Sequence, residues 1–129
     1  MAKVSQFEDL EIWQMGREIA NEIWSLIESS PLKTDFPLRN QINRSSGSIM
    51  DNIAEGFERD GNKEFSHFLS IAKASCGETR SQLCRCLDRK HIDKDTFDKL
   101  RIKTITTSSK IKALMIYLKN SERKGSKFD

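Results

Sequence analysis

The sequence has few residues that interrupt regular secondary structure, with 2 prolines and 6 glycines among 129 residues. A small all-β protein needs many turns, so this scarcity argues against one and favours long helices. No apolar run approaches the roughly 20 residues that a membrane-spanning helix needs, and the N-terminus lacks the apolar core of a signal peptide. We therefore expect one cytoplasmic domain without membrane contact, because single domains commonly have about this length.

Cysteine is also scarce, and its arrangement does not suggest a disulfide framework. The chain has 3 cysteines, Cys76, Cys84 and Cys86. An odd number in a chain without a signal peptide is not typical of disulfide-bonded domains. Cys84 and Cys86 are two positions apart, which places them on nearly opposite sides of a helix. We interpret Cys76 as a small core residue and expect no metal at these thiols.

Apolar residues recur at helical spacing in four segments, over about 10–28, 37–58, 63–87 and 95–118. Short connections that contain Pro31, Gly61 and Asp93 separate them. The fourth pattern is the least regular, because Thr104 and Thr107 are weak helix formers near its middle. This pattern predicts an all-α fold, an antiparallel up-down four-helix bundle with short loops. We expect the bundle domain over 1–120 and a flexible basic tail over 121–129.

Polar residues interrupt the apolar pattern along the second helical segment and reappear on the third. Their spacing of three and four places those of the second segment on one helix face. We interpret the line as a hydrogen-bonded seam that fixes the register of two helices, and a ligand site remains the alternative. The line on the second segment begins at Ser45, and the residues of the predicted polar seam are Ser48, Asn52, Glu55, Arg59, Ser75 and Glu78.

Two carboxylate-x-x-His units resemble the motif with which helical bundles bind two iron ions, Glu64-Phe65-Ser66-His67 and Asp88-Arg89-Lys90-His91. Both units belong to the third helix or its end. At about 1.5 Å per residue, the two histidines are about 36 Å apart and do not share a metal site. The glycines match no phosphate-binding motif, and no Ser-His-acid arrangement is recognisable. We expect no metal, no cofactor and no enzymatic activity.

Charge is distributed unevenly. Residues 1–36 hold 3 basic and 7 acidic residues, whereas residues 37–129 hold 19 basic and 12 acidic residues. This asymmetry indicates a surface for an acidic partner, with RNA or DNA as the first candidate, or else ordinary solvated helix faces. The candidate nucleic-acid-binding residues on the third and fourth segments are Arg80, Arg85, Arg89, Lys99, Arg101, Lys103, Lys110, Lys112 and Lys119.

Several motifs, taken together, resemble a known family. They are Phe7-Glu8-Asp9-Leu10-Glu11-Ile12-Trp13, Gln41-Ile42-Asn43-Arg44 and Asn52-Ile53-Ala54-Glu55-Gly56, followed by Arg59, Glu64-Phe65, Ser75 and Glu78. The chain resembles, over about residues 7–118, the four-helix bundle family named for proteins encoded in intervening sequences of 23S ribosomal RNA genes.

The resemblance implies a four-helix bundle that assembles as a ring-shaped homopentamer and has no established enzymatic activity. It also implies a relationship to the accessory variability determinant of diversity-generating retroelements, which binds nucleic acid and a reverse transcriptase. We therefore expect as partners further copies of this chain, RNA or DNA, and a nucleic-acid-processing protein. A protein-interaction ring without a nucleic-acid role is the alternative.

The sequence itself also suggests self-assembly. Trp13 and Trp24 are eleven positions apart, about three helical turns, so they lie on the same side of the first helix. Either they contribute to an interface between subunits, or both fill the core of a single chain.

Overall fold

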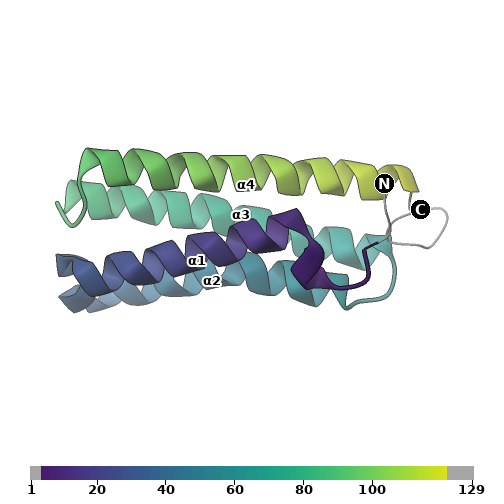
Figure 1. The fold of residues 1–129 in the computed structure, drawn as a ribbon, viewed down its shortest axis with the longest axis horizontal. Coiled ribbons are helices and arrows are strands. Elements are labelled where there is room, and N and C mark those ends of the chain that lie inside the picture. Colours follow the sequence, from purple (N-terminus) through teal and green to yellow (C-terminus); the bar gives the residue numbers. More distant parts are fainter. Residues whose placement is uncertain (1–3, 122–129) are drawn as a thin grey trace.

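The computed structural model describes residues 4–121, which form four long helices. They are α1 (Glu11–Ser29), α2 (Phe36–Phe57), α3 (Asn62–Asp88) and α4 (Lys94–Ser121). A short 3-10 helix, η1 (Phe7–Asp9), precedes α1, and a second, η2 (Pro31–Thr34), joins α1 to α2. Consecutive helices run in opposite directions along one long axis, as Figure 1 shows. The predicted all-α four-helix bundle is therefore confirmed.

The helix ends follow the local sequence, with one exception. Pro37 lies in the first turn of α2, and Gly61, which precedes α3, adopts a φ of 85° that favours glycine. Asp93 caps α4 because its carboxylate accepts a hydrogen bond of 2.8 Å from the backbone N–H of Thr96. At α1 the N-cap is Leu10, and no side chain caps the helix, whereas the sequence suggests Asp9.

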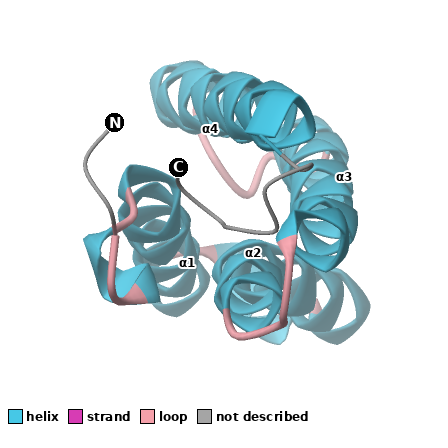
Figure 2. Cartoon of the chain, turned by 90° about the vertical axis from the view of Figure 1, so that its right-hand side faces the viewer, coloured by secondary structure: helices cyan, strands magenta, loops and turns pink. Residues whose placement is uncertain are grey.

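The core lies along the common axis of the four helices. Seen from one end in Figure 2, the helices follow one another around the bundle in chain order. Helices α2 and α3 pack extensively, as do α3 and α4, whereas α1 and α4 are the neighbouring pair with the least contact. Fully buried side chains from all four helices fill the interior, among them Ile19, Ile23, Ile49, Ile53, Phe65, Leu69 and Ile111.

The two tryptophans of α1 have different environments. The ring of Trp13 lies 5.3 Å from that of Phe7 and packs against the core. Trp24 remains 49% exposed. The interpretation that both tryptophans fill the core of one chain therefore fails for Trp24.

Two predictions from the sequence concern the chain ends and membranes. Helix α4 continues to Ser121, and the rest of the predicted tail, 122–129, lies outside the described residues. Within residues 4–121, no helix is long and apolar enough to cross a membrane.

Candidate nucleic-acid interface

The basic residues of α4 lie on two different flanks of the helix. On the flank that faces α1, Lys103 Nζ lies between the carboxylates of Glu18 and Glu22. Two turns further on, Lys110 Nζ lies 3.2 Å from Glu11 Oε1. Hydrogen bonds to Glu18 and Glu22 stabilise the charged amine, which raises the pKa of Lys103. The charges of both lysines are thus matched within the chain.

The opposite flank of α4 carries Arg101, Lys112 and Lys119. Lys112 follows Lys103 by nine positions, about two and a half turns, so it points away from α1. Arg101 and Lys119 are three and two turns from Lys112, counted at about 3.6 residues per turn, and share its face. All three side chains are exposed, and none has an ion-pair partner within residues 4–121. Lys99 lies instead near α1, in a groove between the two helices.

The three candidate arginines in α3 and directly after it also lie on different sides of that helix. Arg85 donates a hydrogen bond of 2.9 Å to Gln41 Oε1, and Arg89 donates one of 2.7 Å to Asp35 Oδ2. Both therefore face α2 and the segment before it. Arg80 is half-buried and has no ion-pair partner in the described part of the chain.

Arg80 lies on the side of α3 that faces α4. It follows Lys73 and Ser66 at intervals of seven positions, so the three share one helix face, and Ser66 lines a groove against α4. Lys73 and Lys63 are not among the residues predicted from the sequence, although the seven-residue spacing from Arg80 points to Lys73. We call the resulting surface the α3–α4 basic face, which comprises Lys63, Lys73, Arg80, Arg101, Lys112 and Lys119.

A groove of about 560 Å³ lies at one end of this face, where the start of α3 passes the end of α4. Helix α3 contributes Asn62, Lys63, Ser66, His67 and Ser70, and α4 contributes Lys112, Met115, Ile116 and Lys119. The groove therefore combines basic, hydroxyl and apolar side chains from two helices.

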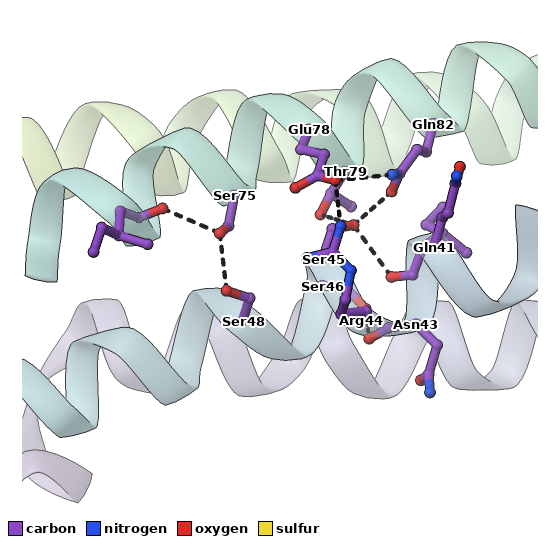
Figure 3. A network of polar contacts seen from close by, with 12 residues as sticks. Gln41, Asn43, Arg44, Ser45, Ser46, Ser48, Ser75, Glu78, Thr79 and Gln82 are labelled. Carbon is purple, nitrogen blue, oxygen red and sulfur yellow. Dashed lines mark hydrogen bonds and ion pairs between the residues drawn. The ribbon is translucent and has the colours of Figure 1, made fainter.

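The polar seam between α2 and α3 is centred on Ser45, Thr79 and Gln82, of which the sequence indicates Ser45 (Figure 3). Thr79 Oγ1 donates a hydrogen bond of 2.9 Å to Ser45 Oγ, which in turn donates one of 2.6 Å to Gln82 Oε1. The hydroxyl of Ser75 lies 3.0 Å from that of Ser48. Since Ser45, Thr79 and Gln82 are buried and bonded to one another, this arrangement favours the structural interpretation of the seam.

The other residues of the predicted seam lie towards its exposed edge. Asn52 donates hydrogen bonds of 2.8 Å to the backbone oxygen and the hydroxyl of Ser48, so it stays within α2. Arg59 pairs with Glu55 at 3.0 Å, one turn away on the same helix. At the other end, Glu78 on α3 accepts a hydrogen bond of 2.5 Å from Arg44 on α2. The seam thus continues as an exposed ion pair between the two helices.

The structure does not bring the two carboxylate-x-x-His units together. Within residues 4–121, no three side chains among His, Cys, Asp and Glu are placed to hold a metal ion. His67 is exposed beside the ring of Phe68, and His91 contacts Asp35 at the opposite end of α3. Burial raises the pKa of Cys76 to about 12 and that of Cys86 to about 11, so neither thiol is a nucleophilic thiolate near neutral pH.

The fold and this surface define an all-helical bundle with one unpaired basic face and a hydrogen-bonded seam. A family model matches residues 8–113, and its description is 23S rRNA-intervening sequence protein. The chain belongs to this family. No curated protein matches the chain.

A solved structure has a similar fold. It is a protein of unknown function of the S23 ribosomal protein family from Bacteroides thetaiotaomicron, and it superposes with a TM-score of 0.73. The two chains share 20% sequence identity, and the alignment covers 81% of this chain and 97% of the other. At this identity the similarity supports the fold.

Proposed function

We propose that this protein is a non-enzymatic helical scaffold of the cytoplasm that binds structured RNA or DNA through the α3–α4 basic face. One observation carries the proposal. Acidic or amide groups pair with Lys103 and Lys110 on the α1-facing flank and with Arg85 and Arg89 on the α2-facing side. By contrast, Arg101, Lys112 and Lys119 have no ion-pair partner among the described residues. Unpaired lysines and arginines along one face are suited to the phosphates of a nucleic acid, because their charge is available to a partner.

The arrangement favours contacts to the phosphate backbone of a nucleic acid over contacts to its bases. Six basic residues follow the lengths of α3 and α4, and no Phe, Tyr or Trp is among the described residues that line the groove at the end of this face. Base stacking on exposed rings is the usual device of single-strand binders, so we expect binding with little dependence on sequence. We also expect affinity to fall steeply with salt. The logarithm of the binding constant should fall against the logarithm of the salt concentration with a slope of about one for each phosphate contacted.

The test is a fluorescence anisotropy titration against structured RNA and duplex DNA at low and physiological salt. The double variant Arg101→Gln/Lys112→Gln should bind more weakly and lower the salt slope by about 2. The matched control is Lys99→Gln/Lys110→Gln, which removes the same charge from the α1-facing flank of the same helix and should have a smaller effect. Equal losses in both variants would contradict a localised interface, and no binding at low salt would leave a protein-interaction ring as the function.

We further propose that the chain assembles with copies of itself, in a ring of five as the family resemblance implies. Trp24 is 49% exposed, and Ile102 is exposed by more than half. Large apolar side chains at these levels of exposure lose contact with water when subunits pack. Light scattering should give the mass of a pentamer for the native chain and a smaller mass for Trp24→Lys. A monomeric native chain would contradict the proposal.

A further inference from the structure

Two exposed aromatic side chains lie on the same side of the bundle, where α1 passes α2. Trp24 on α1 is 49% exposed, and Phe36 on α2 is 55% exposed. This flank of α1 faces α2, because a Cβ atom at Gly16 would lie 3.2 Å from Cβ of Met50. Trp24 follows Gly16 by eight positions and Phe36 precedes Met50 by fourteen. At about 3.6 residues per turn, each shares this flank of its helix.

The surface around these two rings has the composition of a protein interface. We call it the α1–α2 aromatic face, which comprises Trp13, Ala20, Trp24, Phe36, Met50 and Ala54. Two arginines lie over its rings. Arg17 Cζ is 5.6 Å from the centre of the Trp13 ring, and Arg39 Cζ is 4.7 Å from that of Phe36. Aromatic residues, methionine and arginine are enriched in interfaces between proteins, so this face favours a protein partner.

We propose that this partner is a second copy of the chain, which packs the outer side of its α4 on the α1–α2 aromatic face. The outer side of α4 comprises four exposed residues at intervals of four, three and four positions, Ile102, Thr106, Ser109 and Ala113. They lie between the two basic flanks of the helix and carry no charge. Ile102 is 60% exposed, so a partner would remove a large apolar surface from water.

The two surfaces are complementary in size of side chain and in charge at their rims. Large rings project from the α1–α2 aromatic face, whereas the small side chains beside Ile102 leave room for them. Glu28 follows Trp24 by four positions, and Lys99 precedes Ile102 by three. Both are exposed and make no ion pair within residues 4–121. Opposite charges at the rims of two surfaces orient their association.

The outer side of α3 fits this role less well than that of α4. It is also uncharged over several turns, with His67, Ser70, Ala74 and Ser81 on one face, but these residues include no large apolar side chain. The exposed apolar residue of α3 is Ile71, which is 37% exposed and lies one turn before Ser75, on the side of α2. Ile102 therefore favours α4 as the contact.

The two surfaces lie on different sides of one subunit. Helix α4 packs against α1 and α3 and lies diagonally opposite α2 (Figure 2). A contact between two different surfaces is heterologous, so each subunit keeps one surface for the next copy. Repetition of such a contact forms a ring where the rotation closes. The inference deepens the proposed self-assembly and rests on it, and the nucleic-acid titration tests a separate surface.

The experiment measures mass by sedimentation velocity for two variants that each alter one surface. Trp24→Lys alters the α1–α2 aromatic face, and Ile102→Glu alters the outer side of α4. Each variant alone should be a monomer, because the contact needs both surfaces. An equimolar mixture should form a dimer, since Ile102→Glu retains the aromatic face and Trp24→Lys retains the outer side of α4. Both positions are about half exposed or more, so the fold should persist, which circular dichroism checks.

Two controls accompany the mixture. Ile71→Glu places the same charge at an exposed apolar position outside both surfaces and should keep the native mass. The double variant Trp24→Lys/Ile102→Glu lacks both surfaces, so its mixture with Trp24→Lys should stay monomeric.

The outcomes separate this inference from the proposed self-assembly. A monomeric native chain overturns both. If the native chain assembles and Ile102→Glu keeps the native mass, the pairing with α4 is wrong and self-assembly stands. A loss of mass in Ile71→Glu with none in Ile102→Glu identifies α3 as the contact and likewise overturns the pairing. Two monomeric variants that form no dimer on mixing show that the two surfaces do not bind each other.

Discussion

Nε2 of His91 lies 2.8 Å from Oδ2 of Asp35, although the two residues are 56 positions apart in the sequence. Arg89 donates a hydrogen bond of 2.7 Å to the same oxygen. Asp35 directly precedes α2, and Arg89 and His91 follow α3, so the cluster ties the α1–α2 connection to the α3–α4 connection. This contact fixes one end of the bundle and predicts how stability depends on pH.

The hydrogen bonds from His91 and Arg89 lower the pKa of Asp35 from 3.8 to about 2. A carboxylate whose pKa is lower in the folded state stabilises the protein above its unfolded-state pKa. We therefore expect this stabilisation to be complete above about pH 4 and to be lost as the pH falls towards 2. Thermal unfolding of the native chain and of Asp35→Asn, measured across this range, should give melting temperatures that converge at low pH. Asp51→Asn, at an exposed site on α2, is the control and should follow the native curve throughout.

The seam between α2 and α3 makes a second prediction. Ser45→Ala removes the acceptor of the Thr79 hydroxyl and the donor to Gln82 Oε1. Both groups then stay buried without the Ser45 hydroxyl as a partner. The expected loss is about 1–3 kcal/mol of unfolding free energy, the usual cost of an unsatisfied buried group. Chemical denaturation measures it, and Ser70→Ala at an exposed site should cost far less. The triple variant Ser45→Ala/Thr79→Val/Gln82→Leu should recover part of the loss, because it removes the unpaired groups. A single variant as stable as the native chain would show that the seam does not contribute to stability.

The four helices could be predicted from the sequence because their apolar spacing and their end signals agree. Pro31, Pro37 and Gly61 lie within or next to helix ends in the structure. The rotation of α4 about its axis could not be predicted in the same way. Thr104 and Thr107 are buried, yet they look polar in the sequence. Their hydroxyls donate hydrogen bonds to carbonyl oxygens of their own helix, which makes burial acceptable.

The rotation of α4 also decides which of its basic residues belong to the candidate site. The sequence places Lys103, Lys110 and Lys112 together on one helix, but it does not show which of them faces α1. The acids that pair with Lys103 and Lys110 lie more than 80 positions earlier in the chain, so only the packed bundle reveals the pairs. The groove at Asn62 could not be predicted for the same reason, because four of its nine lining residues come from the C-terminal end of α4.

The third prediction concerns Gly56, the last residue of the Asn-Ile-Ala-Glu-Gly motif. A Cβ atom at this position would lie 2.6 Å from Cβ of Phe68 and 3.1 Å from Cδ1 of Phe65. Gly56→Ala should therefore push α2 and α3 apart and cost about 1–3 kcal/mol. Gly47 lies on the same helix, and an added Cβ there meets nothing within 4 Å. Gly47→Ala is the matched control and should stabilise the protein by about 0.5–1 kcal/mol. Denaturant unfolding of both variants measures the difference, and two changes of the same sign would contradict the close approach.

The last prediction separates charge that holds the bundle together from charge that is available to a partner. Lys103 contacts both Glu18 and Glu22, and these contacts join α1 to α4, the neighbouring pair of helices that pack least against each other. Lys103→Gln should lower the free energy of unfolding by up to about 1 kcal/mol, since partly exposed ion pairs contribute little. The loss should shrink in high salt, because salt screens the pairs in the native chain.

Nucleic-acid affinity at a temperature where both proteins are folded should change little, because the charge of Lys103 is already matched. Urea denaturation at low and high salt, combined with the anisotropy titration, measures both effects. If Lys103→Gln weakens nucleic-acid binding as much as Arg101→Gln does, the basic residues act as one field and the division of α4 into two flanks has no functional meaning.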